Sequence, residues 1–327
     1  MLITLGNSPS AAETAAWHAV VVAAHDLDLP ASVPEPSITE TVGKLRVPST
    51  GGRSVHMATT APDGSYTGVA SLMLFTEPAN RHRAFLNALV VRPDARRHGV
   101  GAALWAAVRD ELSSAGRGSV ATVLEVGGAG EAFVDSLGFT NVLPLGWYVQ
   151  RVRRALEEIP PPSLPAGLRF ADWTGVVPDA YAASFALAHE AMNDAPAGEL
   201  AEGAERWDAE RVRAAARVIE ERGGVIHTSV VLDAARGDAV VAYTEVVLRD
   251  PADTRALQYD TVVVPDSRGH GLGRAVKRHL LDGLCELRPG VREITTTVAD
   301  ENTGMLAVNE SLGYRRERAA GVFQLKL

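Results

Sequence analysis

Apolar and polar positions in the second half of the chain follow two periods. Short apolar runs bounded by turn-forming residues predict strands, and stretches with apolar residues at helical spacing predict helices. We place strands at residues 168–172, 225–233, 239–248, 256–264, 292–299 and 314–325, and helices at residues 179–191, 208–222, 272–287 and 303–312. Strands and helices interleaved in this way predict a mixed α/β fold.

The sequence also repeats itself. Residues 90–101 read VVRPDARRHGVG and residues 262–273 read VVVPDSRGHGLG, with eight of twelve positions identical at an offset of 172. A second match, Ser136–Phe139 with Ser311–Tyr314, lies at an offset of 175. Two tandem copies of one fold are therefore predicted. For each copy we expect a short strand, one or two helices, three strands, the helix after the glycine loop, a strand, a short helix and a final hairpin-like pair of strands.

A proline-rich segment separates the two copies. Pro160, Pro161, Pro162 and Pro165 remove backbone donors and fix φ, so this segment cannot continue a helix or a central strand. A chain of 327 residues is also long enough for two domains. We predict an N-terminal domain at residues 1–157, a linker at 158–166 and a C-terminal domain at 167–327.

Composition narrows the function classes. A formal net charge of −8 has the wrong sign for a protein whose main partner is nucleic acid or an anionic membrane, and it favours cationic substrates. The beginning of the chain lacks the basic-then-apolar pattern of a secretory signal, so we expect a cytoplasmic protein. Cys285 is the sole cysteine, and the nine histidines show no metal-ligand spacing, so no metal is expected.

The second copy of the repeat carries a glycine loop of a kind that suits an anionic ligand. The segment Arg268–Gly273 follows an apolar strand and opens an amphipathic helix. Alternate glycines let backbone N–H groups approach an anion closely, and the helix N-terminus adds partial positive charge. Arg268 can pair with a phosphate, and His270 can add one more hydrogen bond. A pyrophosphate fits such a loop, although a turn of this kind without a ligand is the alternative.

The pattern Val-x-x-Pro-x-x-Arg-x-x-Gly-x-Gly, followed by Asn302-x-x-Met305-x-x-x-Asn309-x-x-Leu312-Gly313-Tyr314, resembles the GNAT superfamily of acyl-CoA-dependent N-acetyltransferases. The resemblance covers both halves, and so implies a tandem form, each half a mixed, mostly antiparallel sheet flanked by helices. It implies acetyl-CoA as cosubstrate, its pyrophosphate on the loop and its pantetheine arm along the preceding strand. The implied coenzyme-binding residues are Val262, Val263, Val264, Arg268, Gly269, His270, Gly271, Leu272, Gly273, Arg274, Asn302 and Asn309. Their counterparts in the N-terminal half are Leu89, Val90, Val91, Arg96, Arg97, His98, Gly99, Val100 and Gly101.

The reaction implied by the resemblance is direct attack of an amine on the acetyl thioester, which needs a base for the amine and an acid for the thiolate. The candidate base is Asp260, with Tyr259 as the alternative. Both stay open because a bulge in this strand, frequent in the family, would reset the side-chain alternation. Glu245, on the neighbouring strand, is a further candidate. Cys285 lies on the helix after the loop, where a buried small hydrophobe is expected rather than a nucleophile.

The acid departs from the family pattern. The usual tyrosine, five positions before the last aromatic, is replaced by Asn309, which can bind the coenzyme but cannot supply a proton. Tyr314 or water remains for that role. The first half departs further, with Val134 at that position and Asn87-Ala88 where the second half has Tyr259-Asp260. We therefore expect catalysis in the second half, with a non-catalytic or degenerate first half.

Substrate selection is expected in the first helices of the second half and the segment that follows them. Acidic residues gather there, with Glu190, Asn193 and Asp194 as candidate amine-binding residues, followed by Glu199, Glu202, Glu205, Asp208 and Glu210. The leading prediction is an N-acetyltransferase for a small cationic amine, such as a specialised metabolite, an antibiotic or a thiol-cofactor precursor. A protein N-acetyltransferase and a non-catalytic acyl-CoA-binding scaffold stay open. We expect no nucleic acid or membrane partner, and either a monomer or a homodimer.

Overall fold

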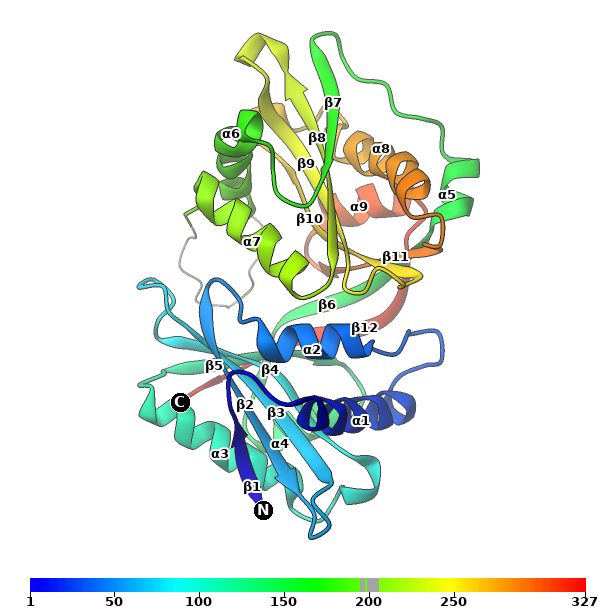
Figure 1. Cartoon of the computed structure of the whole chain (residues 1–327). Coiled ribbons are helices and arrows are strands. Elements are labelled where there is room, and N and C mark those ends of the chain that lie inside the picture. The colour runs from blue at the N-terminus through cyan, green and yellow to red at the C-terminus, as the bar shows by residue number, and fades with distance from the viewer. Residues whose placement is uncertain (195–197, 199–205) are drawn as a thin grey trace. The chain divides into compact units, whose positions relative to one another are not determined.

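A computed structural model describes residues 1–194, 198 and 206–327 of the chain. These residues form two compact units, which are coloured from blue to red along the chain in Figure 1. Unit 1 consists of Met1–Pro144, Gly198 and Ala320–Leu327, and unit 2 holds the other described residues. No helix in the described part of the chain is both long and apolar enough to cross a membrane.

Unit 1 is built on a mixed sheet with the order β1–β2–β3–β4–β5–β12. All neighbours pair antiparallel except β4 and β5, which are parallel. Its strands are β1 (Leu2–Leu5), β2 (Gly52–Thr60), β3 (Tyr66–Phe75), β4 (Arg83–Val91), β5 (Ser119–Glu125) and the last part of β12 (Arg315–Lys326). Its helices are α1 (Ala11–Asp28), α2 (Ile38–Arg46), α3 (Val100–Ser114) and α4 (Ala129–Ser136), with a short 3-10 turn, η1 (Pro93–Ala95).

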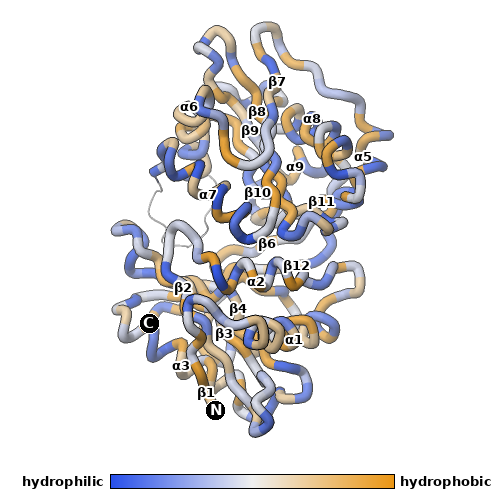
Figure 2. The backbone as a smooth tube through the Cα atoms, in the orientation of Figure 1, coloured by the Kyte–Doolittle hydropathy of each residue, from blue (hydrophilic) through white to orange (hydrophobic). Residues whose placement is uncertain are grey.

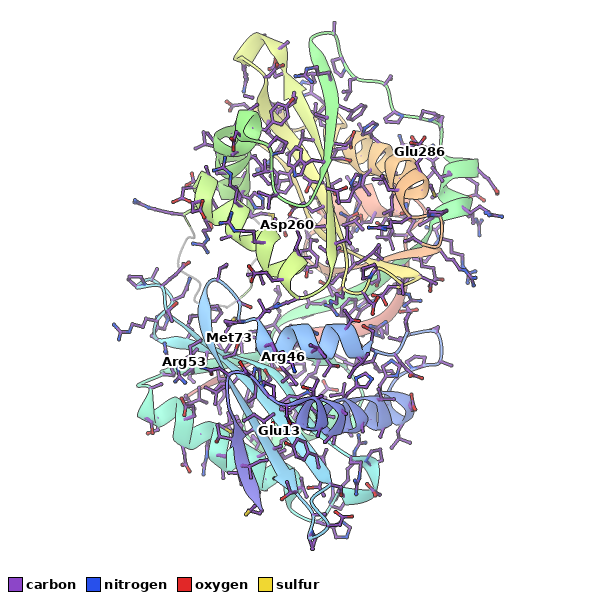
Figure 3. All side chains as sticks on the ribbon, in the orientation of Figure 1. Glu13, Arg46, Arg53, Met73, Asp260 and Glu286 are labelled. Carbon is purple, nitrogen blue, oxygen red and sulfur yellow. The ribbon has the colours of Figure 1, made fainter. Side chains whose placement is uncertain are left out.

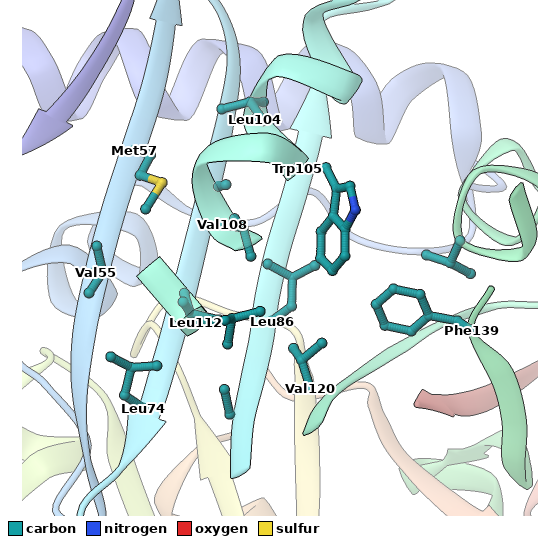
Figure 4. Packing of buried hydrophobic residues seen from close by; sticks show 14 of the residues in the cluster. Val55, Met57, Leu74, Leu86, Leu104, Trp105, Val108, Leu112, Val120 and Phe139 are labelled. Atoms are coloured by element: carbon teal, nitrogen blue, oxygen red, sulfur yellow. The ribbon is translucent and has the colours of Figure 1, made fainter. Parts of the chain in front are cut away.

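Helices cover both faces of this sheet. On one face Trp17 and Val20 of α1 and Leu45 of α2 pack against β1, β2 and β3. On the other, Leu104 and Trp105 of α3 pack with alternate residues of β2, β3 and β4, as Figure 4 shows. The period-two alternation of each strand thus feeds two apolar layers.

Unit 2 repeats the arrangement with the sheet order β6–β11–β10–β9–β8–β7. Its strands are β7 (Leu168–Thr174), β8 (Val225–Asp233), β9 (Ala239–Leu248), β10 (Arg255–Val263), β11 (Glu293–Ala299) and the last part of β6 (Thr140–Arg151). Its helices are α5 (Val152–Glu158), α6 (Asp179–Glu190), α7 (Ala209–Glu221), α8 (Leu272–Leu287) and α9 (Thr303–Ser311), with the 3-10 turns η2 (Ala191–Asp194), η3 (Ala234–Arg236) and η4 (Pro265–Ser267).

The core of unit 2 also has two layers. Helices α6 and α7 cover one face of the sheet, through Phe185 and Val212. Helix α8 covers the other face through Val276 and Leu280. Both layers use β9, along which nearly every residue is buried. Most of its residues are hydrophobic (Figure 2), with Thr244 and Glu245 as polar exceptions. The mixed, mostly antiparallel α/β fold predicted for each half is confirmed.

Most predicted elements of the second half lie within a few residues of their observed bounds, but the predicted final pair of strands is wrong. Each half ends in one long strand, β6 or β12, and each of these strands is divided between the units. Leu145–Arg151 of β6 pairs with β11 in unit 2, while Ala320–Lys326 of β12 pairs with β5 in unit 1. The C-terminal end of the chain therefore completes the sheet of the N-terminal unit.

The proline-rich segment forms neither helix nor strand between Glu158 and Leu168. It is not detached from unit 2, because Ile159 is buried and its carbonyl accepts a hydrogen bond of 2.8 Å from Nε of Arg278.

Candidate active site

Two neighbouring strands of unit 2 separate where the predicted site begins. β10 and β11 pair in parallel only from Arg255–Leu257 with Glu293–Thr295, although both strands continue beyond this ladder. The other edge of β10 remains paired with β9 as far as Val263. Beyond Leu257, therefore, one edge of β10 has backbone groups that no strand in the described residues of unit 2 pairs. An extended ligand can bind such an edge as an added strand does.

Unit 1 has the same separation at the equivalent place. β4 pairs with β5 only over Arg83–Phe85, and then continues to Val91.

The loop between β10 and α8 presents backbone N–H groups. Gly269 and Gly271 have φ values of 81° and 74°, which are left-handed conformations that glycine adopts without strain. Gly271 is the N-cap of α8 and brings no side-chain cap, so the first N–H groups of α8 stay available to an anion.

The loop of unit 1 keeps this backbone although its sequence differs. Gly99 has a φ of 80°, and Arg97, at the position of Gly269, has a φ of 64°. A non-glycine residue in this region carries about 1 kcal/mol of backbone strain. Unit 1 thus keeps the left-handed turn even where the sequence lacks the glycine.

The loop arginines have the same two contacts in each unit. Arg268 donates to the carbonyl of Val263 (3.0 Å) and to a carboxylate oxygen of Asp194 (2.8 Å). Arg96 donates to the carbonyl of Val91 (3.1 Å) and, through both terminal nitrogens, to Asp28 (2.7 and 2.6 Å). Each arginine is thereby fixed beside its loop by an aspartate at the end of an early helix or just after it, Asp28 in α1 and Asp194 in η2.

Two carboxylates lie on the α6/α7 side of unit 2, where β10 is irregular. The register between β9 and β10 shifts between Gln258 and Thr261, which is a bulge at Tyr259 and Asp260. Glu245, opposite this bulge, is buried and accepts a hydrogen bond of 3.2 Å from the hydroxyl of Thr228. Burial, and then the negative charge of Asp260 (Figure 3), raises the pKa of Glu245 to about 8. The bulge that kept both Tyr259 and Asp260 open as the base is therefore present in this strand.

An imidazole shares this side of the sheet. His189 of α6 shares a hydrogen bond of 3.0 Å with the hydroxyl of Tyr243, and its Nδ1 lies 3.9 Å from a carboxylate oxygen of Asp260. Burial lowers the pKa of His189 to about 3, so the ring is neutral and its contact with Asp260 is not an ion pair. Burial and the nearby carboxylates raise the pKa of Tyr243, which stays a phenol.

A glycine loop after a strand, an opening beside that strand and a carboxylate at a bulge are thus present in one unit. The model of the family described as "Acetyltransferase (GNAT) family" matches residues 34–139 and 188–314, which together are most of the chain. The chain belongs to the GNAT acetyltransferase family.

A curated relative and two solved structures extend this family assignment. The chain is 32% identical over 281 residues to a mycothiol acetyltransferase of Catenulispora acidiphila, covering 81% of this chain and 79% of that one. It is similar to a tandem GNAT protein from the clavulanic acid biosynthesis pathway, with a TM-score of 0.84 and 23% identity over 100% of this chain and 98% of that one. A GNAT protein from Sphaerobacter thermophilus follows, with a TM-score of 0.68 and 16% identity over 99% and 95%. The chain is an acyltransferase with tandem GNAT folds.

Within this GNAT fold, the predicted coenzyme residues lie on β10, the loop and the first turn of α8, apart from Asn302 and Asn309, which belong to α9 and its N-cap. Val262 packs toward α6, and Leu272 and Gly273 are buried under the loop. His270 is exposed, with its Nδ1 3.3 Å from the carbonyl of Ser267. Asn302 caps α9, because its side chain accepts a hydrogen bond of 3.1 Å from the backbone of Met305.

The predicted acid-side residues lie on the other face of the same sheet. Asn309 is 1% exposed and its Oδ1 accepts a hydrogen bond of 2.7 Å from Nζ of Lys277. Tyr314 is also buried, which raises the pKa of its hydroxyl, and that hydroxyl donates to Oε1 of Gln258 at 3.4 Å. Sequence reasoning missed Lys277 and Gln258. The sequence did hold a signal for them, because Lys277 and Gln258 are polar where their counterparts in the first half, Trp105 and Leu86, are apolar.

The predicted amine-binding residues are dispersed at the end of α6. Glu190 and Asn193 are exposed, and Asp194 contacts the loop arginine rather than Glu245 or Asp260. Tyr259 is 40% exposed. Glu199, Glu202 and Glu205 lie outside the described residues. Asp208 caps α7 by accepting a hydrogen bond of 2.8 Å from the backbone of Arg211.

Two further groups bear on the chemistry. Cys285 packs against the apolar core under α8, and burial raises the pKa of its thiol, which is the opposite of what a nucleophile needs. In the described part of the chain no three His, Cys, Asp or Glu side chains are arranged to hold a metal ion.

Proposed function

We propose that this acyltransferase moves an acetyl group from acetyl-CoA to the amine of a small cationic molecule, and that unit 2 performs the transfer. The observation that carries the proposal is the carboxylate pair Glu245 and Asp260, placed at the bulge where β10 separates from β11. The equivalent positions of unit 1, fixed by the strand register, are Ser71 and Ala88.

The glycine loop and the open edge of β10 would together hold the coenzyme. The pyrophosphate would bind the N–H groups before α8, and the pantetheine arm would pair with the unpaired edge of β10 after Leu257. GNAT proteins generally use acetyl-CoA. The thioester would then lie at the separation of the strands, within reach of both faces of the sheet.

The chemistry follows from the raised pKa of Glu245. An amine must lose a proton to attack a thioester, and a base with a pKa near 8 accepts that proton far better than an ordinary carboxylate. Asp260 contributes negative charge that attracts a cationic amine and keeps Glu245 basic. His189 and Tyr243, held neutral by burial, fix the wall beside these carboxylates.

The net charge of the chain and the names of two similar proteins both favour a small cationic amine. The chain has a net charge of −8, and acidic residues are frequent after α6. The relative at 32% identity is named a mycothiol acetyltransferase, and the tandem GNAT structure comes from the clavulanic acid pathway. Both names concern small molecules, which supports a metabolite over a protein substrate for this chain.

Acetyl-CoA binding tests the proposal through a matched pair of variants. Asparagine and aspartate have nearly the same shape and both tolerate left-handed backbone, and a Cβ at Gly271 meets no atom within 4 Å. Gly271→Asp therefore adds a charge that Gly271→Asn does not. We expect calorimetry to show acetyl-CoA binding to Gly271→Asn and at least about 50-fold weaker binding to Gly271→Asp.

The same pair at Gly99 asks whether unit 1 binds the coenzyme, since a Cβ there is equally unobstructed. Loss of one binding site per chain in Gly99→Asp would assign a coenzyme to unit 1 as well. Equal affinities for the Asp and Asn variants at Gly271 would contradict the coenzyme assignment and favour a scaffold.

A further inference from the structure

A buried polar network crosses the α8/α9 face of unit 2. Nζ of Lys277, whose residue is 3% exposed, donates to Oδ1 of Asn309 at 2.7 Å and lies 4.5 Å from the centre of the Tyr314 ring. The Tyr314 hydroxyl continues the network to Gln258. Nε2 of Gln258 in turn donates to Oγ1 of Thr244 at 2.8 Å and to the carbonyl of Glu245 at 2.6 Å.

This network reaches the point where the strands separate. Gln258 is the last residue of β10 before the bulge, one position after the end of the ladder with β11. Thr296 of β11 lies over it, with its hydroxyl 3.5 Å from the Gln258 carbonyl. The cation of Lys277 is thus linked through buried side chains to the position proposed for the thioester.

Unit 1 has the same fold, with apolar residues in place of the side chains that link Lys277 to Gln258 and Thr244. Only the contact of Thr296 is kept, because its counterpart Thr122 donates to the carbonyl of Leu86 at 2.8 Å. By the repeat offsets and the strand register, the other counterparts are Trp105, Val134, Phe139, Leu86 and Ala70 in place of Lys277, Asn309, Tyr314, Gln258 and Thr244. Trp105 and Phe139 form an edge-to-face pair, with ring centres 5.4 Å apart, where unit 2 has Lys277 over Tyr314. The fold therefore forms with an apolar core here, and the polar network is not a requirement of folding.

The network also leaves donors without acceptors. Nδ2 of Asn309 is buried and has no hydrogen-bond partner among the described residues. Among those residues the contacts of Lys277 are the Asn309 amide and the Tyr314 ring, and neither carries a negative charge. Burial, without any contribution from a neighbouring charge, lowers the pKa of Lys277 to about 7. A buried cation and an unpaired amide are costly unless an electron-rich ligand group meets them.

We infer that Lys277, held in place by Asn309, supplies the positive charge and the proton for the coenzyme A thiolate that acyl transfer releases. The inference rests on the proposed use of acetyl-CoA. Nδ2 of Asn309 has no partner among the described residues and would donate to the sulfur, while Nζ of Lys277 lies 2.7 Å from Oδ1 of the same amide.

The step balances without any further reagent. The amine nitrogen uses its lone pair to form the C–N bond, and its proton passes to Glu245. When the C–S bond breaks, its electron pair goes to sulfur, and the resulting thiolate takes a proton from Lys277. Neutral Lys277 and protonated Glu245 then exchange protons with solvent, which returns both groups to their starting states.

The direct test is the pKa of the thiol of coenzyme A bound to the intact protein, followed by the ultraviolet absorbance of the thiolate during a pH titration. Desulfo-coenzyme A provides the blank. Lys277→Met removes the charge at nearly constant shape, and Lys277→Arg keeps it. Lys326→Met, at an exposed lysine on β12, is the matched control. Thermal melting verifies that each variant is folded.

We expect Lys277→Met to raise the pKa of the bound thiol by about one unit or more, a tenfold change in the thiolate equilibrium. Lys277→Arg and Lys326→Met should stay near the wild type. An unchanged thiol pKa in a folded Lys277→Met variant that still binds coenzyme A overturns this inference and leaves the proposed function intact. No binding of coenzyme A by the wild type overturns both.

Discussion

Glu245 lies in an environment that disfavours the charged form of its carboxyl group. It is buried beside Asp260, so its carboxyl group stays protonated to an unusually high pH. Because the base must be deprotonated, we expect kcat/KM for a small amine to rise with pH through about 8 in the wild type.

The same argument predicts the direction of two variants. Asp260→Asn removes a negative charge that raises the pKa of Glu245, so the rising limb should move to lower pH. Glu245→Gln should remove that limb and lower kcat/KM by about 100-fold or more. A profile of kcat/KM against pH measures both effects. A limb that remains in Glu245→Gln would mean that another group is the base.

The burial of Lys277 leads to a prediction about stability that does not depend on any substrate. Its pKa of about 7 in the folded chain lies below the ordinary value of 10.5, so the folded state holds fewer protons than the unfolded state between these pH values. The free energy of unfolding of the wild type should therefore rise with pH from about 7 to about 10.5, by up to about 1.4 kcal/mol per unit from this residue.

Lys277→Met lacks that dependence and should be more stable than the wild type at pH 7, with the difference vanishing above pH 10.5. Urea unfolding at several pH values measures the difference. A variant less stable than the wild type at pH 7 would show that the ammonium group has a counter-charge in the folded chain.

At the scale of elements, an ion pair joins the turn η2 to the glycine loop before α8. Asp194 holds Arg268 by an ion pair in which both side chains are about half exposed, and such pairs contribute about 0.2–1 kcal/mol. Release of the arginine should therefore tighten acetyl-CoA binding in Asp194→Asn by up to about fivefold in calorimetry. A higher KM for the amine with unchanged coenzyme affinity would instead return Asp194 to the substrate role expected from the sequence.

Elements were the part of the structure that the sequence predicted best. The bounds of β8, β9 and α8 were predicted to the residue, because apolar runs and a periodic helix end there at turn-forming residues. The site was predicted in part. The loop follows from local sequence and the bulge from the resemblance to the GNAT superfamily, but the contact of Lys277 with Asn309 joins α8 to α9 across 32 residues of sequence. The local sequence also does not indicate which strands β6 and β12 pair with.

At the scale of the whole molecule, the last residues of the chain belong to the N-terminal unit. Phe323, close to the C-terminus, is buried in the core of unit 1 and pairs with Thr122 of β5. Phe323→Ala should destabilise unit 1 by about 3–5 kcal/mol. Hydrogen exchange should show the loss of protection in β5 and α3 first. Loss confined to unit 2 would contradict the observed exchange of strands.

The central claim is that acyl transfer takes place in unit 2 with acetyl-CoA on its glycine loop. Thiol release from acetyl-CoA in the presence of small cationic amines tests it most directly, with Gly271→Asp compared with Gly271→Asn and the same pair at Gly99. The account predicts that Gly271→Asp loses about 50-fold or more of kcat/KM relative to Gly271→Asn, while the Gly99 pair differ little. Loss of turnover in Gly99→Asp alone would place the reaction in unit 1 and contradict the account.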